Sequence, residues 1–193
     1  MAVVLVAVAY LLGSFPSGVV IGRFRGRDVR SEGSGNIGAA NAARVLGRAA
    51  GAGVGALDIV KGVVAVVVAR WAGTDAGVVA LVALAAVVGH DFSVFLGFKG
   101  GKGVATTIGV ALALSFPAGM VVAAVWVGVA LIARISSVAS LAALACLPIA
   151  LAVTGGPIWY VELGFVLFVL AVVKHRGNIA RLLRGTEPGW GKK

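Results

Sequence analysis

Long apolar stretches alternate with short polar segments along most of this chain. Apolar runs bounded by glycine, proline and charged residues predict seven helices, at about 2–22, 49–70, 76–90, 104–116, 118–133, 137–153 and 157–173. Pro117 separates the fourth helix from the fifth, and Gly155-Gly156-Pro157 separates the sixth from the seventh. The pattern predicts an all-α integral membrane protein with seven transmembrane helices, in which residues 1–193 form a single domain.

Two of the predicted helices are shorter than an ordinary membrane span. A span needs about 20 residues to cross roughly 30 Å of hydrocarbon, and segments 76–90 and 104–116 fall short of that length. A glycine-rich loop joins these two helices. We therefore expect the loop to dip below the membrane surface, shielded by neighbouring helices.

Composition supports the membrane prediction. Mean hydropathy is +1.06, and only 12% of the residues are charged, whereas soluble domains average about 25%. The net charge of +10 would favour a nucleic-acid partner in a soluble protein. Here the charge follows the loops, so no nucleic acid is expected. The single cysteine, Cys146, lies in an apolar run, which argues against a disulfide framework and a cysteine metal site. No metal is expected.

The positions of lysine and arginine predict the orientation. Segments 23–48, 91–103, 134–136 and 174–193 carry 6, 2, 1 and 6 of these residues, which is 15 of the 17 in the chain. With seven spans all four segments face the cytoplasm, as the positive-inside rule requires, so the N-terminus lies outside and the C-terminus inside. Merging 104–133 into one helix would leave six spans and place the basic tail outside.

The first helix is expected to be retained. No lysine or arginine precedes Arg23, so the segment lacks the basic region of a signal peptide. The first segment is therefore interpreted as an uncleaved helix.

The loop at 97–107, Gly-Phe-Lys-Gly-Gly-Lys-Gly-Val-Ala-Thr-Thr, has the composition of a phosphate site. Successive glycines allow backbone N–H groups to form a concave anion nest. A helix that starts near Val104 would direct the positive end of its dipole into the same hollow. The Walker A spacing is absent because Gly103 follows Lys102, which argues against a nucleotide-hydrolysing motor. A flexible loop with solvated lysines is the alternative.

Segment 33–44 forms a second polar cluster. It matches G-x-G-x-x-G, but the strand and βαβ unit of a dinucleotide site are missing. If the segment is helical from Ile37, Asn41 and Arg44 face one way, and amide and guanidinium groups suit hydroxyl and phosphoryl oxygens. An interfacial helix anchored by arginines to anionic headgroups explains the composition equally well.

A third polar cluster, at 175–187, follows the last predicted helix. His175 and Asn178 are three residues apart and would share a helix face. A basic juxtamembrane helix bound to acidic lipid accounts for the arginines of this segment. It does not explain the histidine and the amide, which suit a polar site.

A few polar residues fall within or beside the predicted spans. Asp58 and Lys61 are three apart in the second helix, and we expect a cavity-facing ion pair there. His90 ends the third helix, where it could orient the loop or contact a ligand. Ser140 could face the pocket, although a serine hydroxyl often bonds its own helix instead.

The sequence resembles the bacterial acyl-phosphate:glycerol-3-phosphate acyltransferase family in segments 34–44, 58–62, 89–106 and 175–187. These segments occur in the family's order and spacing over nearly the whole chain. Ala40 is a departure, because threonine is more usual there. Acyltransferases that use coenzyme A carry H-x-x-x-x-D, but Phe95 and Ala180 stand five residues after the two histidines.

The resemblance implies transfer of a fatty acyl group from acyl phosphate to the sn-1 hydroxyl of glycerol 3-phosphate. The products would be lysophosphatidic acid and inorganic phosphate, at the start of phospholipid biosynthesis. It implies a multi-pass protein of the bacterial cell (inner) membrane whose active site faces the cytoplasm, with a functional link to an enzyme that makes acyl phosphate. Because an acyl phosphate is already activated, no cofactor is expected.

Residue roles follow from the clusters and the resemblance together. The residues assigned to catalysis are Ser34, Arg44, Lys102, His175 and Asn178. Those assigned to substrate or phosphate binding are Gly35, Asn36, Asn41, Lys61, His90, Lys99, Gly100, Gly101, Gly103, Thr106 and Ser140. Asp58 and Glu187 receive structural roles. His175 is a possible general base, but the phosphate of the donor could accept the hydroxyl proton instead.

Two other functions are compatible with parts of the pattern. A small organophosphate transporter would also bind phosphate at broken helices, but the chain lacks internal repeats and its polar clusters all lie on one face. A lipid-binding scaffold leaves the histidines and amides unexplained.

Overall fold

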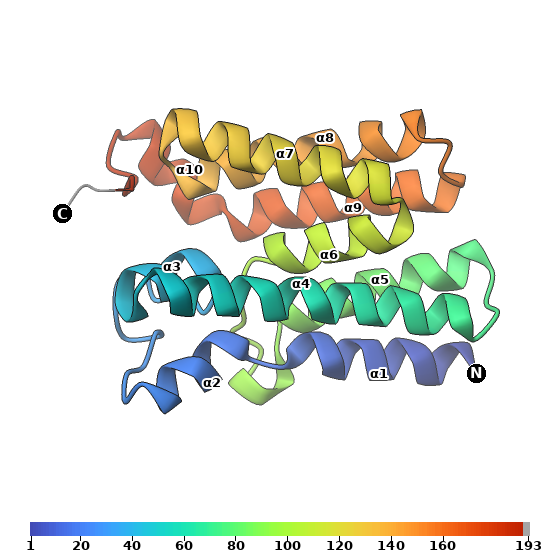
Figure 1. Ribbon diagram of the computed structural model, residues 1–193, viewed down its shortest axis with the longest axis horizontal. Coiled ribbons are helices and arrows are strands. Elements are labelled where there is room, and N and C mark those ends of the chain that lie inside the picture. The colour runs from blue at the N-terminus through green and yellow to red at the C-terminus, as the bar shows by residue number, and fades with distance from the viewer. Residues whose placement is uncertain (191–193) are drawn as a thin grey trace.

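The computed structural model describes residues 1–190, and every regular element in that range is a helix. In chain order the elements are α1 (Ala2–Ser14), α2 (Ser17–Phe24), α3 (Ala39–Leu46), α4 (Arg48–Trp71), α5 (Ala76–Asp91), the 3-10 helix η1 (Val94–Leu96), α6 (Val104–Leu114), α7 (Phe116–Ala133), α8 (Ser136–Val153), α9 (Ile158–Lys174) and α10 (Arg176–Leu183). The longer helices lie along one axis of the molecule, with the N-terminus at one end and α3 and α10 at the other (Figure 1).

Six of the seven predicted helices are confirmed with small changes at their ends. The first, expected over 2–22, is instead divided into α1 and α2. The break lies at Pro16, which has no N–H group to donate and whose ring disfavours the helical turn before it. Two short helices that were not counted as elements, α3 and α10, flank the bundle at its polar end.

By length and hydropathy, the described residues contain fewer than the seven membrane-spanning helices predicted from the sequence. Five helical stretches are long and apolar enough to cross a membrane, or six if the pair α9 and α10, bent by 61°, counts as one. Both helices beside the glycine-rich loop are shorter than about 20 residues, as expected: α5 has 16 residues and α6 has 11. Together with η1, however, α5 forms an apolar stretch of 21 residues, Ala76–Leu96, which is long enough to cross a membrane.

Close backbone contact holds α6 against α4. A Cβ atom added to Gly62 would lie 2.3 Å from the carbonyl oxygen of Thr106, and one added to Gly109 would lie 2.0 Å from that of Ile59. Only glycine allows this separation, and such contacts are typical of helix packing in membranes. They fix the start of α6, which forms one wall of the site described below.

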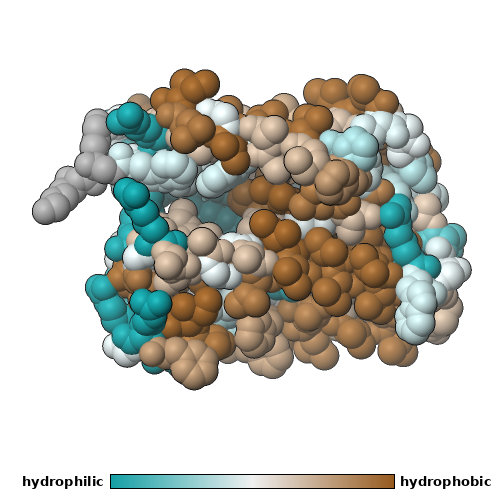
Figure 2. Space-filling model, viewed as in Figure 1, coloured by the Kyte–Doolittle hydropathy of each residue, from teal (hydrophilic) through white to brown (hydrophobic). Residues whose placement is uncertain are grey.

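The other end of α6 has its own partner. Arg70 donates from Nη1 to the carbonyl of Ala113 at 2.6 Å and from Nη2 to that of Leu114 at 2.9 Å. The last carbonyl groups of a helix have no intrahelical donor, and those of α6 receive both bonds from this guanidinium. Hydrophilic side chains gather at the two ends of the molecule, while hydrophobic residues cover most of the surface between them (Figure 2).

Candidate active site

A cavity of about 580 Å³ lies near the end of the bundle that carries α3 and α10. Figure 2 shows a hollow on this side of the molecule, between the helices α7–α10 and the helices α3 and α4. The polar walls come from segment 33–44, α10 and the C-terminal segment, and the apolar ones include Ile59 of α4, Ile108 of α6 and Trp126 of α7. One cavity thus joins a charged region to an apolar one.

The cavity brings together all five residues predicted to be catalytic: Ser34, Arg44, Lys102, His175 and Asn178. Seven other predicted residues also line it: Asn36, Asn41, Asp58, His90, Gly103, Ser140 and Glu187. Six predicted binding residues do not line it: Gly35, Lys61, Lys99, Gly100, Gly101 and Thr106. Each of the three polar clusters therefore contributes residues to the cavity, but several predicted members of the clusters lie outside its lining.

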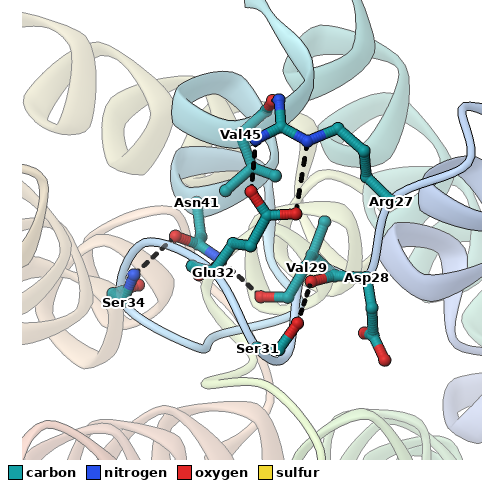
Figure 3. Close-up of polar contacts among 8 residues, drawn as sticks. All are labelled: Arg27, Asp28, Val29, Ser31, Glu32, Ser34, Asn41 and Val45. Atoms are coloured by element: carbon teal, nitrogen blue, oxygen red, sulfur yellow. Dashed lines mark hydrogen bonds and ion pairs between the residues drawn. The ribbon is translucent and has the colours of Figure 1, made fainter.

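Asn41 organises the loop that leads into α3 (Figure 3). Its Oδ1 accepts from the N–H of Ser34 at 2.7 Å, and its Nδ2 donates to the carbonyls of Val29 at 2.8 Å and Glu32 at 3.1 Å. The side chain is 2% exposed. Both ends of the amide bond backbone groups, so Asn41 holds the loop and places Ser34 at the cavity; its role in substrate binding stays a prediction.

An exposed ion pair braces the same loop. Arg27 pairs with Glu32 and donates to the carbonyl of Val45 in α3 (Figure 3). Asn36 closes a local turn by accepting from the N–H of Gly38 at 2.8 Å, which leaves its Nδ2 at the cavity.

Among residues 1–190, Arg44 has no partner of its own. Within the same range its side chain makes no hydrogen bond or ion pair, so its full charge is available to an anionic ligand.

The glycine-rich loop does not form the expected nest at Gly100 and Gly101. Their N–H groups donate to the carbonyls of Asp91 at 3.3 Å and His90 at 2.9 Å, at the end of α5. The free donors lie slightly later in the chain. Val104 and Ala105 line the cavity in the first turn of α6, where N–H groups lack intrahelical acceptors and the helix dipole is positive. The backbone donors that remain available to an anion in this loop region are therefore those at the start of α6.

Two more assignments near this loop are corrected. Lys99 is exposed and lies away from the cavity. Thr106 is fully buried, and its backbone carbonyl lies against Gly62 of α4. Neither side chain is placed to bind a phosphate in the cavity.

Gly101 is required for packing, which gives a testable consequence. A Cβ atom there would lie 2.0 Å from Nε2 of His90. We expect Gly101→Ala to displace that ring, to destabilise the protein by about 1–3 kcal/mol as overpacking does, and to lower kcat/KM at least tenfold. Gly128→Ala on α7 is the matched control, because a Cβ atom at Gly128 has nothing within 4 Å. Equal melting temperatures and activities for both variants in detergent would contradict this assignment.

The ion pair expected in α4 is present and deeply buried. Nζ of Lys61 lies 2.9 Å from Oδ1 of Asp58, which also accepts from Oγ of Ser17 at 2.7 Å. The same ammonium lies 2.7 Å from Nδ1 of His90 and donates to the carbonyl of Phe15 at 3.2 Å. That carbonyl precedes Pro16, where the helix breaks. Lys61 is therefore a structural residue, and its predicted role in phosphate binding is corrected.

Lys102 belongs to a hydrogen-bonded chain that ends at the C-terminal segment. Its Nζ donates to Oδ1 of Asn178, and Nδ2 of Asn178 donates to Oε1 of Glu187 at 2.5 Å. Glu187 also accepts from Ser137 and from Nε of Arg181, both at 2.7 Å. Burial lowers the pKa of Lys102 to about 8, although the carboxylate of Glu187 opposes the shift. Glu187 therefore has the structural connections predicted for it.

His175 presents one ring nitrogen to the cavity. Its Nδ1 lies 2.8 Å from the carbonyl oxygen of Ala171 and donates to it, which leaves Nε2 as an acceptor. Ser140 is less free. Its hydroxyl donates to the carbonyl of Ser136 at 2.7 Å and accepts from Nε1 of Trp126 at 3.2 Å. The alternative of a serine bonded to its own helix is thus correct for Ser140.

Among the cavity residues with polar side-chain groups, four were missing from the predicted set: Trp126, Ser136, Ser137 and Arg181. Arg181 gave a signal, since it lies three residues after Asn178 on the same helix face, but it was assigned to lipid headgroups. Trp126 lies in an apolar helix where nothing in the local sequence distinguishes it from a lipid-facing aromatic residue.

Comparison with known proteins gives a consistent result. The family model for glycerol-3-phosphate acyltransferase matches residues 3–185. A glycerol-3-phosphate acyltransferase of Rubrobacter xylanophilus is 46% identical over 98% of this chain and 95% of its own length. One of Geobacter sulfurreducens is 45% identical over 95% of both.

A solved structure is similar over nearly the whole fold. The crystal structure of PlsY (YgiH), an integral membrane glycerol 3-phosphate acyltransferase, in its glycerol 3-phosphate form has a TM-score of 0.94 and 42% identity, covering 98% of this chain and 96% of that one. Its lysophosphatidic acid form has a TM-score of 0.93.

Proposed function

This chain belongs to the glycerol-3-phosphate acyltransferase family, and on that premise we propose that it transfers a fatty acyl group from acyl phosphate to the sn-1 hydroxyl of glycerol 3-phosphate. The products are lysophosphatidic acid and phosphate. The observation that carries the proposal is the single cavity in which Arg44, Lys102 and the first turn of α6 meet apolar walls. Phosphate charge and an acyl chain can both be accommodated there.

The charged groups have complementary tasks in this proposal. Arg44 and Lys102 neutralise phosphate charge, and the N–H groups of Val104 and Ala105 add oriented donors. Asn178 and His175 position glycerol 3-phosphate. Ser34 reaches the cavity with its hydroxyl free of partners within the described chain, and donates a hydrogen bond to a phosphoryl or acyl oxygen.

The reaction is direct transfer in a ternary complex. The sn-1 oxygen forms a bond to the acyl carbonyl carbon, and the bond from that carbon to the phosphate oxygen breaks. The hydroxyl proton passes to the departing phosphate, or to Nε2 of His175. Catalysis then depends on orientation and electrostatics, which a fixed set of charges and N–H donors provides.

The alternative to direct transfer is a covalent route in which Ser34 is first acylated. A nucleophilic serine needs a neighbouring base held by an orienting group, and no hydrogen-bonded base contacts Ser34 within residues 1–190. We expect purified protein to form lysophosphatidic acid with intersecting initial-rate lines, and acyl phosphate alone to leave no acyl adduct. Parallel lines, with an acyl-Ser34 ester that glycerol 3-phosphate discharges at the turnover rate, would overturn direct transfer.

A small organophosphate transporter is distinguished by the same preparation. In sealed vesicles, a transporter would exchange labelled glycerol 3-phosphate across the membrane without any acyl donor. The acyltransferase requires acyl phosphate and converts the label to lysophosphatidic acid. Transport without acylation would refute the proposed function.

The proposed topology has seven crossings, with the N-terminus outside and the cavity at the cytoplasmic face of the bacterial inner membrane. Successive helices from α4 to α9 run in alternating directions, and the N-terminus lies at the end opposite α3 and α10 (Figure 1). This arrangement supports the orientation that the basic segments predict. Acyl phosphate would then arrive from a cytoplasmic or membrane-bound enzyme that synthesises it.

Single-cysteine labelling tests this topology in a Cys146→Ala background. An impermeant thiol reagent added to intact cells should modify Thr74→Cys, in the connection between α4 and α5. It should modify Lys99→Cys and Thr186→Cys only after permeabilisation, because the proposed topology places segments 91–103 and 174–193 on the cytoplasmic side. External labelling at either of the last two positions would contradict the proposed orientation.

A further inference from the structure

The segment 185–190, called here the C-terminal strap, leaves α10 and folds back onto the start of α8. It supplies Glu187 and Pro188 to the cavity wall. We propose that Trp190 is a positioning residue for acyl transfer: it clasps the strap to α8 and so holds Glu187 where its carboxylate orients Asn178 toward Lys102. This inference rests on the proposed function and deepens it.

Trp190 attaches the strap by three contacts. Its indole Nε1 donates to Oγ of Ser136 at 2.8 Å, and its backbone N–H donates to the carbonyl of Arg134 at 2.6 Å. Its ring lies 6.1 Å from that of Trp126, tilted by 51°, which is a favourable aromatic arrangement. Arg134 adopts a left-handed conformation with φ 54° at the end of α7. The clasp thus joins the C-terminal strap to the α7–α8 turn.

The link from Trp190 to Glu187 is short. Only two residues intervene, and one of them is Pro188, whose ring fixes φ. Because Glu187 accepts bonds from Ser137, Asn178 and Arg181, its position depends on α8 and α10 together. Release of the clasp would free the strap from α8 on one side of this carboxylate.

The carboxylate decides how the amide of Asn178 is oriented. An ionised carboxylate only accepts hydrogen bonds, so the amide must present Nδ2 to Glu187. Its Oδ1 then faces Lys102 and accepts from the ammonium. Without Glu187 in place, Nδ2 of Asn178 loses its acceptor, and only the bond from Lys102 to Oδ1 holds the amide.

The charged groups around Lys102 set its pKa, so a change in this chain of contacts can be measured as a change in the pH dependence of activity. Lys102 faces Glu187 in the strap, Arg181 in α10, Arg44 in α3 and Lys174 in α9. Together these influences lower the pKa of Lys102 to about 8: burial is the main cause, Glu187 opposes it, and the cations Arg181, Arg44 and Lys174 add to it. Displacement of Glu187 therefore lowers the pKa of Lys102. The protonated form of Lys102 would then be lost at a lower pH, and with it the activity.

The experiment compares Trp190→Ala and Trp190→Phe with the wild type in kcat/KM for glycerol 3-phosphate across pH 6 to 10. The phenylalanine variant keeps a ring against Trp126 but lacks the indole donor. We expect Trp190→Ala to lose about tenfold in kcat/KM at pH 7, mainly through KM, and its alkaline limb to move about half a unit toward lower pH. Trp190→Phe should shift the limb in the same direction by less.

Controls separate this role from general destabilisation. Trp71→Ala removes a tryptophan that is 90% exposed at the other end of the bundle, and should keep the wild-type profile. Trp190→Ala combined with Glu187→Gln should lose little more activity than Glu187→Gln alone, because both act on Asn178 and Lys102.

The outcomes are distinct. An unshifted alkaline limb in Trp190→Phe and Trp190→Ala, or multiplicative losses in the double variant, overturns the positioning role while wild-type acylation leaves the proposed function standing. If Trp190→Ala does not fold, Trp190→Phe decides by the presence or absence of its shift. A wild-type protein that forms no lysophosphatidic acid refutes the proposed function itself.

Discussion

Alanine at Lys102 or at Arg44 is expected to lower kcat/KM by about 30- to 1,000-fold, equivalent to about 2–4 kcal/mol of transition-state stabilisation. Both cations line the cavity. Negative charge grows on the leaving phosphate as the acyl group departs, and a positioned cation stabilises that charge more in the transition state than in the bound substrates. Steady-state kinetics with acyl phosphate and glycerol 3-phosphate measure the loss.

Two variants make this result specific. Arg184→Ala removes an exposed cation just after α10 that does not line the cavity, and should change kcat/KM little. Lys102→Arg keeps the charge but alters its geometry, and should retain more activity than Lys102→Ala. Equal small losses at Arg44, Lys102 and Arg184 would mean that the positive charge serves membrane anchoring instead of catalysis.

Asp58→Ala is expected to have the largest effect on stability, about 3–5 kcal/mol, because it leaves the ammonium of Lys61 buried without its counter-ion. The two side chains are 1% and 5% exposed. The variant also removes the acceptor of Ser17, which connects α2 to α4. Thermal unfolding in detergent, followed by fluorescence, should show a clear fall in the melting temperature.

The double variant Asp58→Ala/Lys61→Met tests the cause of that loss. It removes both charges, so it should recover much of the stability, as replacement of a buried ion pair by apolar side chains often does. It should not recover full activity, because His90 loses the lysine that contacts its Nδ1. A double variant less stable than Asp58→Ala would show that Lys61 stabilises the fold through Phe15 and His90 alone.

The sequence determined the features that depend on local composition. Apolar stretches fixed the helices α4 to α9, because a helix in lipid satisfies its own backbone and needs only a run of apolar side chains. The break at Pro16 was missed because the short polar interruption from Ser14 to Ser17 lies between two apolar stretches that were counted as one run. The polar clusters around Ser34, Lys102 and His175 stood out for the same local reason, since polar groups are costly near a membrane without a function.

The tertiary structure decided which polar groups are free to bind a ligand. Lys61 bonds Phe15, 46 residues away, and His90, 29 residues away. Its ammonium group is therefore already paired inside the bundle and is not available to a ligand. The N–H groups of Gly100 and Gly101 bond the end of α5, so the donors left for the proposed anion site are those in the first turn of α6. Local sequence lists donors and acceptors, but only the packing of distant helices determines which are already paired.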